Sequence, residues 1–376
     1  MFDGRPRELH RPNLTVSEEV AVVDCVRSGF VSSVGECVEK FEQSLASFTH
    51  STSVVAVSSG TAALEVALRL AGVSVDEEVV CPALTFIGTA NAISHLGATP
   101  YLVDSEEHTF GIDPHALRQE LSRIATVRGG EVRNRRTNRR IAAIVPVHLF
   151  GHPCDLTQLL QISHEFAIPI VEDAAESLGS FHGVAHTGTV GVLGTLSFNG
   201  NKIVTTGGGG AILTSDLELG AKARHLTTTA RVGRTWRFSH DEVGYNYRLP
   251  NINAALGYSQ MEKLPRFVEA KRRLFNRYRA EFGDLRGANL VSEPTWGSSN
   301  YWLVTLLLDR GLEHLQEEII ESSRDHGYNL RPVWTPLHLT KPYSKSQRAP
   351  LPVAEGLANR IINLPSGSDS VNFNVV

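Results

Sequence analysis

The stretch Ser53-Val54-Val55-Ala56-Val57-Ser58-Ser59-Gly60-Thr61-Ala62-Ala63-Leu64 decides the fold class of this 376-residue chain. Its first five residues are typical of a buried strand, and the run from Ala62 to Leu70 predicts a helix. A strand that leads through a small polar turn into a helix is the repeating unit of α/β proteins. The free N–H groups, hydroxyls and helix dipole at such a turn favour a bound phosphate, although Ser59 or Thr61 could equally serve only as the helix cap.

The same pattern recurs along the chain. Further strands are predicted over 78–81, 99–104, 141–147, 168–173, 195–198 and 210–213. Seven strands that alternate with helices predict a mostly parallel sheet between helical layers. We expect residues 1–250 to form this large domain together with a loose N-terminal arm. Residues 251–376 are expected to form a smaller α+β lobe, which one long helix over about 251–282 enters.

Composition narrows the class of protein. A formal net charge of -4 argues against general nucleic-acid binding. The run from Arg128 to Arg140 carries six arginines, but it lacks interleaved aromatic residues and is better interpreted as a solvated hairpin. No apolar run approaches membrane-spanning length. The four cysteines show no CxxC spacing, so we expect reduced thiols in a cytoplasmic protein: Cys25, Cys37, Cys81 and Cys154.

The end of the fourth predicted strand carries residues that superficially resemble metal ligands. His148, His152 and Cys154 lie close together in the sequence. No matching second pair follows them, so we predict a packed turn that opens a helix at Asp155 and no metal site.

Polar and aromatic residues follow several of the predicted strands. Groups that follow parallel strands gather at the carboxyl edge of the sheet. Phe86 is there either a core residue or a flat surface for stacking on a planar ring. Glu172 and Asp173 end the fifth strand; one could cap a helix while the other pairs with a protonated ring nitrogen. Ser197 adds a hydroxyl at the end of the sixth.

Lys202 stands on a turn that four glycines follow, at 207–210. A lysine on a turn is usually a solvated charge. Near a cofactor, however, it could form a Schiff base and later move a proton. A phosphate cradle, an aromatic plane, an acid, a hydroxyl and an amine together match the requirements of pyridoxal phosphate. The combination therefore predicts a pyridoxal phosphate enzyme.

Six motifs, in their order and spacing, resemble the sugar aminotransferases of the DegT/DnrJ/EryC1/StrS group, which have the fold type I architecture of aspartate aminotransferase. The resemblance runs from about Pro12 to Pro365. The motifs that carry it lie over 29–35, 59–64, 82–86, 172–177, 197–202 and 244–248.

The resemblance implies roles for the residues that would hold the cofactor. Lys202 is then the Schiff-base lysine, Asp173 the partner of the pyridine nitrogen and Phe86 the stacking residue. Glu176 falls near the phenolic oxygen, where many members have Gln or His. The phosphate positions fall to Ser59, Gly60, Thr61 and Ser197.

Asn246 corresponds to a residue that reaches the phosphate of the neighbouring subunit's cofactor. The resemblance therefore implies a homodimer with shared active sites. It also implies that the family's final helix, which normally follows residues 363–365, is missing, because residues 366–376 are too few to form it.

Within the family, the chain looks most like the LegC branch. Those enzymes transfer an amino group from glutamate to C4 of a UDP-linked 4-keto-6-deoxy-N-acetylhexosamine. Amination at C3 or C4 of another nucleotide keto sugar, GDP- or dTDP-linked, and a non-catalytic regulator remain alternatives; a dehydratase would have histidine in place of Lys202. Candidates for contacting the nucleotide or sugar, each of which could instead be packing in a loop or interface, are Ser32, Ser33, His225, Tyr301, Arg331 and His338.

Overall fold

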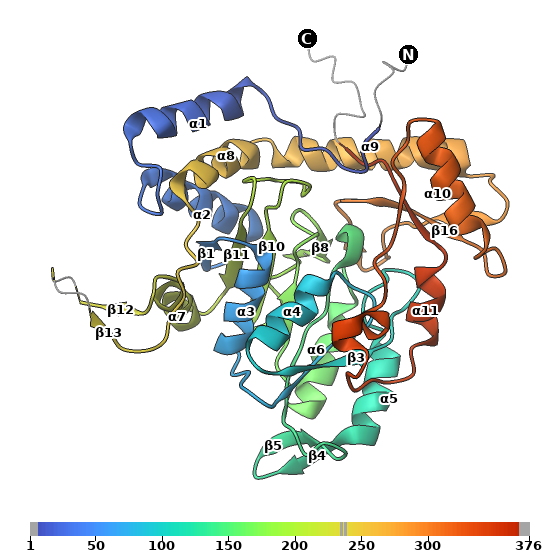
Figure 1. Cartoon of the computed structure of the whole chain (residues 1–376), viewed down its shortest axis with the longest axis horizontal. Helices are drawn as coiled ribbons and strands as arrows, with labels where there is room; N and C mark the ends of the chain where they lie inside the picture. Colours follow the sequence, from blue (N-terminus) through green and yellow to red (C-terminus); the bar gives the residue numbers. More distant parts are fainter. Residues whose placement is uncertain (1–6, 234–235, 237–238, 368–376) are drawn as a thin grey trace.

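The computed structural model describes residues 7–233, 236 and 239–367, and a seven-stranded sheet lies at its centre (Figure 1). One half of this sheet has the strand order β1-β11-β10-β7 and the other half β3-β2-β6. Parallel bridges from Ile144 to Ile170 and from Val147 to Asp173 join β6 to β7. The strands are β1 Ser53–Val57, β2 Glu78–Pro82, β3 Thr99–Val103, β6 Ile141–Ile144, β7 Val171–Asp173, β10 Leu193–Ser197 and β11 Gly210–Thr214.

Six of these strands run in one direction, because β11 alone is antiparallel to both of its neighbours. The prediction of a mostly parallel seven-stranded sheet is therefore confirmed. Alternate residues of β2 show the two buried faces. Val79 and Cys81 pack in the core under α3 and α4, whereas Val80 packs in the core formed with α5 and α6.

Four of the five helices that cover the central sheet begin at a polar cap residue. The side chains of Ser59, Asp113, Asp155 and Asp216 each accept a hydrogen bond from a first-turn N–H group. The helices are α3 Gly60–Leu70, α4 Ile87–His95, α5 Pro114–Ile124, α6 Leu156–Phe166 and α7 Leu217–Thr227.

Two N-terminal helices, α1 Val16–Ser28 and α2 Glu36–Thr49, lie against α8 Asn251–Met261 (Figure 1). Helix α1 is capped by Thr15 in a capping box, in which the Thr15 N–H donates to Glu18 Oε2 at 2.7 Å. The valines of α1 do not reach the core; Val20, Val23 and Val26 are all exposed.

The long helix expected over about 251–282 is two helices. The second, α9 Leu264–Phe282, starts after a break at 262–263 and has Pro265 in its first turn, a position that proline favours. Beyond it lies an antiparallel sheet of order β14-β16-β18-β17, so the expected smaller α+β lobe is present. It comprises β14 Ala288–Leu290, β16 Val304–Leu308, α10 Leu315–Asp325, β17 Arg331–Pro332, α11 Pro352–Ala358 and β18 Ile361–Leu364.

Short elements complete the fold. The arginine-rich segment forms the predicted hairpin of β4 Ala125–Arg128 and β5 Glu131–Asn134. The others are β8 Phe181–His182, β9 Ala185–His186, β12 Arg231–Val232, β13 Ser239–His240, β15 Gly297–Ser298 and the 3-10 turns η1 Leu149–Gly151, η2 Leu337–Leu339 and η3 Lys341–Tyr343. None of the helices in the described ranges is both long and apolar enough to cross a membrane. A domain boundary at 250/251 stays a prediction. The predicted lack of a final helix concerns residues 366–376, of which 368–376 lie outside the described part.

Candidate active site

A cavity of about 260 Å³ lies at the carboxyl edge of the central sheet. It brings together eight of the nine residues predicted to hold the cofactor: Ser59, Gly60, Thr61, Phe86, Asp173, Glu176, Ser197 and Lys202. They come from the ends of β1, β2, β7 and β10 and from the turns that follow. This is the edge at which ligands bind in open α/β sheets.

The start of α3 forms one end of the cavity. Ser59 caps the helix, because its Oγ accepts from the Ala62 N–H at 3.1 Å. A Cβ at Gly60 would lie 2.8 Å from the Cβ of Ser197, and one at Gly210 would lie 2.4 Å from the Ser59 carbonyl oxygen. Only glycine therefore lets this helix approach β10 and β11 so closely. The result is a narrow cradle of N–H groups and hydroxyls that suits a phosphate.

Asp173 forms the floor of the cavity and is 7% exposed. Its Oδ2 accepts from Thr89 Oγ1 at 2.8 Å and its Oδ1 from the Ala175 N–H at 3.2 Å. Burial raises the pKa of this carboxyl. Among the described residues, no cationic side chain lies within ion-pair distance of Asp173. A buried acid with neutral donors and no cation of its own fits a protonated ring nitrogen.

Phe86 is 51% exposed and lines the cavity, so it is not the core residue that the sequence allowed as an alternative. It precedes α4, the helix that also carries Thr89. Its ring meets that of Trp334 edge to face, with centroids 5.8 Å apart. The half-exposed ring offers the flat surface that a planar cofactor requires.

Lys202 and Glu176 form an ion pair inside the cavity, with Nζ 3.3 Å from Oε1. The other carboxylate oxygen, Oε2, accepts from the Phe150 N–H at 2.9 Å. Burial raises the pKa of Glu176. The ammonium of Lys202 also lies 3.8 Å from the centre of the Trp302 ring. Lys202 is therefore a partly buried, paired amine rather than a solvated surface charge.

Sequence reasoning missed several residues that line this cavity, among them Thr89, Asn201, Trp302 and Trp334. Thr89 lies in the first turn of α4, three residues beyond Phe86, and this proximity is a signal that could have found it. Asn201 directly precedes the lysine, and Trp302 and Trp334 stand within segments whose neighbours, Tyr301 and Arg331, were chosen instead.

The other predicted residues lie outside the cavity. Asn246 is exposed and pairs across an antiparallel bridge with Thr228. Tyr301 is 2% exposed, stacks on Phe275 with centroids 4.2 Å apart, and its hydroxyl accepts from the Glu293 N–H. The other residues predicted to contact the nucleotide or sugar do not line the cavity either: Ser32, Ser33, His225, Arg331 and His338.

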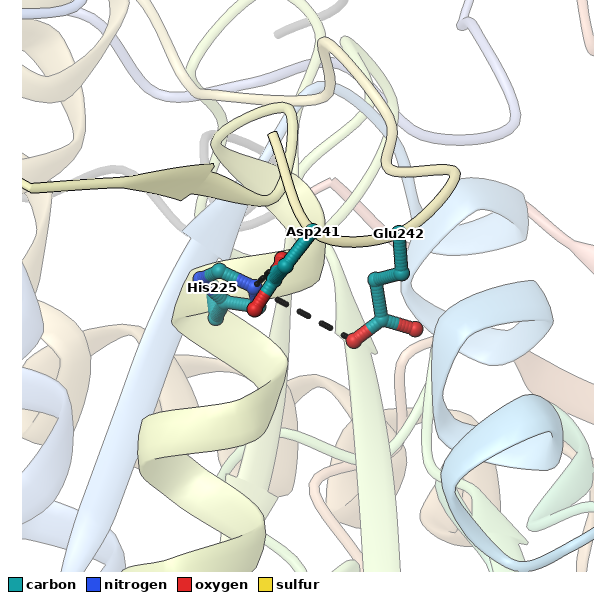
Figure 2. Close-up of side chains that lie close together, drawn as sticks. All are labelled: His225, Asp241 and Glu242. Carbon is teal, nitrogen blue, oxygen red and sulfur yellow. Dashed lines mark hydrogen bonds and ion pairs between the residues drawn. The ribbon is translucent and has the colours of Figure 1, made fainter. Parts of the chain in front are cut away.

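His225 faces two acids on the surface (Figure 2). Its Nε2 lies 2.7 Å from Asp241 Oδ1 and 4.0 Å from Glu242 Oε1. The second oxygen of Glu242 pairs with Arg69 at 3.0 Å. These contacts tie the segment after β13 to α7 and α3, which accounts for the cluster without a ligand.

The suggested metal ligands at the end of β6 lie in a packed turn. His148 Nδ1 accepts from the Cys154 N–H at 3.1 Å, so Nε2 carries the proton and donates to Glu172 at 3.0 Å. A doubly protonated ring would set one N–H against another, and we therefore assign the neutral form. Glu172 also accepts from the N–H groups of Gly188, Val190 and Gly191. Helix α6 begins directly after this turn with Asp155 as its cap, as predicted.

The fold and the cavity define a class of protein. A seven-stranded sheet that presents a phosphate cradle, an aromatic plane, a buried acid and a lysine at one edge is that of a pyridoxal phosphate-dependent enzyme of fold type I. The model of the DegT/DnrJ/EryC1/StrS aminotransferase family matches residues 12–372, and the chain belongs to this family. Pyridoxal phosphate is its cofactor.

Individual relatives agree with this assignment over nearly their full lengths. EpsN of Bacillus subtilis (strain 168), assigned as a pyridoxal phosphate-dependent aminotransferase, is 36% identical over 96% of this chain and 91% of its own. GDP-perosamine synthase of Escherichia coli O157:H7 is 34% identical over 98% and 95%. The crystal structure of the aminotransferase TlmJ from Streptoalloteichus hindustanus superimposes with a TM-score of 0.86, at 28% identity over 96% and 93%.

Proposed function

We propose that this protein transfers an amino group from glutamate to C4 of a UDP-linked 4-keto-6-deoxy-N-acetylhexosamine. The observation that carries the amino-transfer part is the meeting of Lys202, Asp173, Phe86 and the 59–61 cradle in one cavity. The sugar and the nucleotide rest on the motif resemblance to the LegC branch.

Each residue of the cavity has a distinct task in this proposal. Bound pyridoxal phosphate supplies the electron sink for the carbon that loses or gains nitrogen. Asp173 holds a proton on the ring nitrogen, and Phe86 supports the ring. Lys202 Nζ bonds the cofactor and, once released, moves a proton at the reacting carbon. Glu176 lies beside that amine and orients it.

A homodimer with shared active sites is part of the proposal. Two observations support it. Asn246 is exposed outside its own cavity, where it is available to a second subunit. The exposed apolar side chains of α1 and of the loop after it form a surface typical of an interface: Val16, Val20, Val23, Val26, Phe30, Val31 and Val34.

The dimer can be tested by size. We expect Val23→Asp to shift the protein toward the monomer in analytical ultracentrifugation, because it places a charge in the apolar surface. Wild type that sediments as a monomer at micromolar concentration would contradict this part of the proposal. We also propose the cytoplasm as the compartment, since all four cysteines are unpaired, and cell fractionation tests this.

A GDP-linked keto sugar is the second candidate substrate. The observation in its favour is the similarity to GDP-perosamine synthase, at 34% identity over 98% of this chain. Both reactions would use the same cofactor-binding residues. The two substrates differ in the nucleotide and in whether the sugar carries an N-acetyl group.

One experiment addresses both candidates. The purified protein is incubated with glutamate and UDP-, GDP- or dTDP-linked 4-keto and 3-keto sugars, and the products are identified by mass spectrometry. We expect amination of the UDP-linked 4-keto sugar. Lys202→Ala should lose the visible absorbance of the bound cofactor and about 10⁴-fold in activity, whereas Lys222→Ala, an exposed lysine on α7, should keep both. A wild-type protein that does not bind pyridoxal phosphate would overturn the proposal.

A further inference from the structure

The turn 300–302, just before β16, turns Trp302 toward Lys202 through a backbone conformation that tyrosine rarely adopts. Tyr301 has φ +48°, in the left-handed region. The Asn300 side chain fixes this conformation, because its Oδ1 accepts from the Trp302 N–H at 2.7 Å. Its Nδ2 donates to the carbonyls of Glu176 and Leu178 at 3.0 and 2.9 Å. These hydrogen bonds connect the turn before β16 to the segment that carries Glu176.

A second left-handed turn packs against the first. Phe150 has φ +56°, and its N–H donates to Glu176 Oε2. Gly151 follows with φ +95°, and a Cβ there would lie 1.9 Å from Asn300 Oδ1. Strained backbone of this kind persists only where the surroundings over-determine it, and it concentrates at functional sites. Both strained turns here meet at Glu176 and Trp302.

These turns hold the amine of Lys202 from two sides. Its Nζ lies 3.8 Å from the centre of the Trp302 ring and 3.3 Å from Glu176 Oε1. The Trp302 indole N–H donates to the carbonyl of Asn201 at 2.7 Å and so fixes the peptide that leads into Lys202. One side chain therefore contacts both the charged end of the lysine and its backbone.

Two residues other than Lys202 and Asn201 also contact Trp302, one at its backbone and one at its ring. The buried ammonium of Lys271 donates to the carbonyls of Trp302 and Ser366 at 3.0 and 2.7 Å. His10, from the N-terminal arm, places its ring 6.5 Å from that of Trp302. Burial lowers the pKa of His10 well below its ordinary value, so this neighbour is uncharged and does not compete with Lys202 for the indole.

We infer that Trp302 is a positioning residue for Lys202: its ring and the Glu176 carboxylate form a holding site for the ammonium whenever the lysine is not bonded to the cofactor. The inference rests on the proposed function, in which every turnover frees this amine. A lysine kept in the holding site returns to one place and one orientation, whereas a lysine without it samples many rotamers. The holding site therefore speeds the return of the amine to the cofactor.

The test follows the amine by absorbance and needs no sugar. Cofactor-free protein is mixed with pyridoxal phosphate, and the rate at which visible absorbance appears is recorded. The loaded protein is then converted with glutamate and returned with 2-oxoglutarate. Trp302→Leu removes the aromatic ring and the N–H, whereas Trp302→Phe removes the N–H and keeps a smaller aromatic ring. Trp296→Phe is the matched control, because its indole also donates to a carbonyl, that of Pro153 at 3.1 Å, away from Lys202.

We expect Trp302→Leu to slow both absorbance recoveries about tenfold, as the loss of a desolvated cation–π contact allows. Trp302→Phe should slow them roughly threefold, since phenylalanine keeps a weaker ring contact. Trp296→Phe should match wild type. Equal rates in Trp302→Phe and Trp296→Phe would overturn the inference, even if Trp302→Leu does not fold. Wild type that gains no absorbance would instead contradict the proposed function itself.

Discussion

The floor and the wall of the cavity are built in different ways. The floor consists of residues at the ends of regular strands, in ordinary backbone conformations: Ser59, Gly60, Thr61, Asp173 and Ser197. The wall consists of Trp302 together with two irregular turns that support it from outside the lining. These turns contain the left-handed residues Phe150, Gly151 and Tyr301, and Asn300 links them. The floor is held by the sheet, whereas the wall is held by a few side-chain hydrogen bonds from Asn300 and Lys271.

This difference predicts two kinds of sensitivity. The floor should respond to a change of charge or of a donor and tolerate small changes in shape. Each strained residue of the wall stores about 1–3 kcal/mol, so the wall should respond most strongly to added volume. Substitutions on each side can separate these behaviours.

The largest effect is expected on the floor, from Asp173→Asn. The amide has the shape of the carboxylate but cannot hold a proton on the ring nitrogen as an acid does. We expect the rate of amino transfer to fall by roughly 10²–10³-fold, the scale of losing one aligned electrostatic group. Thermal unfolding of the cofactor-free protein, measured beside it, should change little. A mutant that keeps wild-type turnover would remove Asp173 from the proposed chemistry.

The next effect concerns the volume of the wall, through Gly151→Ala. The new methyl group would collide with Asn300 Oδ1, and the three hydrogen bonds of the Asn300 side chain leave that amide no other position. We expect a loss of about 3 kcal/mol in the free energy of unfolding by denaturant.

Gly311→Ala is the matched control for that loss. Gly311 has φ +93°, close to the +95° of Gly151, and nothing lies within 4 Å of its would-be Cβ. It therefore measures the backbone cost alone. Equal losses in the two mutants would show that Asn300 gives way and that the wall is not rigid.

Glu176, which contacts both the Phe150 N–H and Lys202, gives a pH dependence of stability. Burial raises the pKa of Glu176 in the folded protein, so the unfolded chain loses this proton first as the pH rises. Below the pKa of Glu176 in the unfolded chain, this carboxyl is protonated in both states and does not lower the free energy of unfolding. The cofactor-free protein should therefore lose stability as the pH rises through the raised pKa, and Glu176→Gln should flatten this slope in urea titrations. An unchanged slope would show that Glu176 titrates alike in both states.

The smallest effect is expected at the cradle of the floor, from Ser59→Ala. Loss of the cap should cost about 1 kcal/mol of stability. Asp216→Ala, at the cap of α7 and outside the cavity, should cost a similar amount. Only Ser59→Ala should also weaken the binding of pyridoxal phosphate, measured by absorbance titration. Equal cofactor affinity in both would leave Ser59 as a helix cap alone.

The same contrast explains which parts could be predicted from the sequence. Strands, caps and the floor follow local rules: an apolar run, a polar cap, a glycine where helix and strand approach. Six of the seven central strands are therefore parallel as expected, and eight of nine cofactor residues meet in one cavity. The break between α8 and α9 also had a local signal in Pro265, which the amphipathic pattern concealed.

The wall could not be predicted in this way. In a regular strand Tyr301 and Trp302 would point to opposite faces, and nothing in the local sequence says that Tyr301 is left-handed. In that conformation Tyr301 is buried against Phe275, and Trp302 lines the cavity. The exposed valines of α1 illustrate another limit of local rules, since helical spacing identifies an apolar face but not whether this chain covers it.

The backbone contact between Ser366 and Leu9, 2.6 Å from N to O, places the two described ends of the chain side by side. The described part of the chain therefore almost closes on itself, and a short linker could join residues 9 and 366. The Gly129-Gly130 turn of the β4–β5 hairpin is exposed, with nothing near either would-be Cβ, and offers a place to cut the joined chain. A circular permutant cut there would keep every contact of the cavity, and it would move both new ends to the opposite end of the molecule (Figure 1).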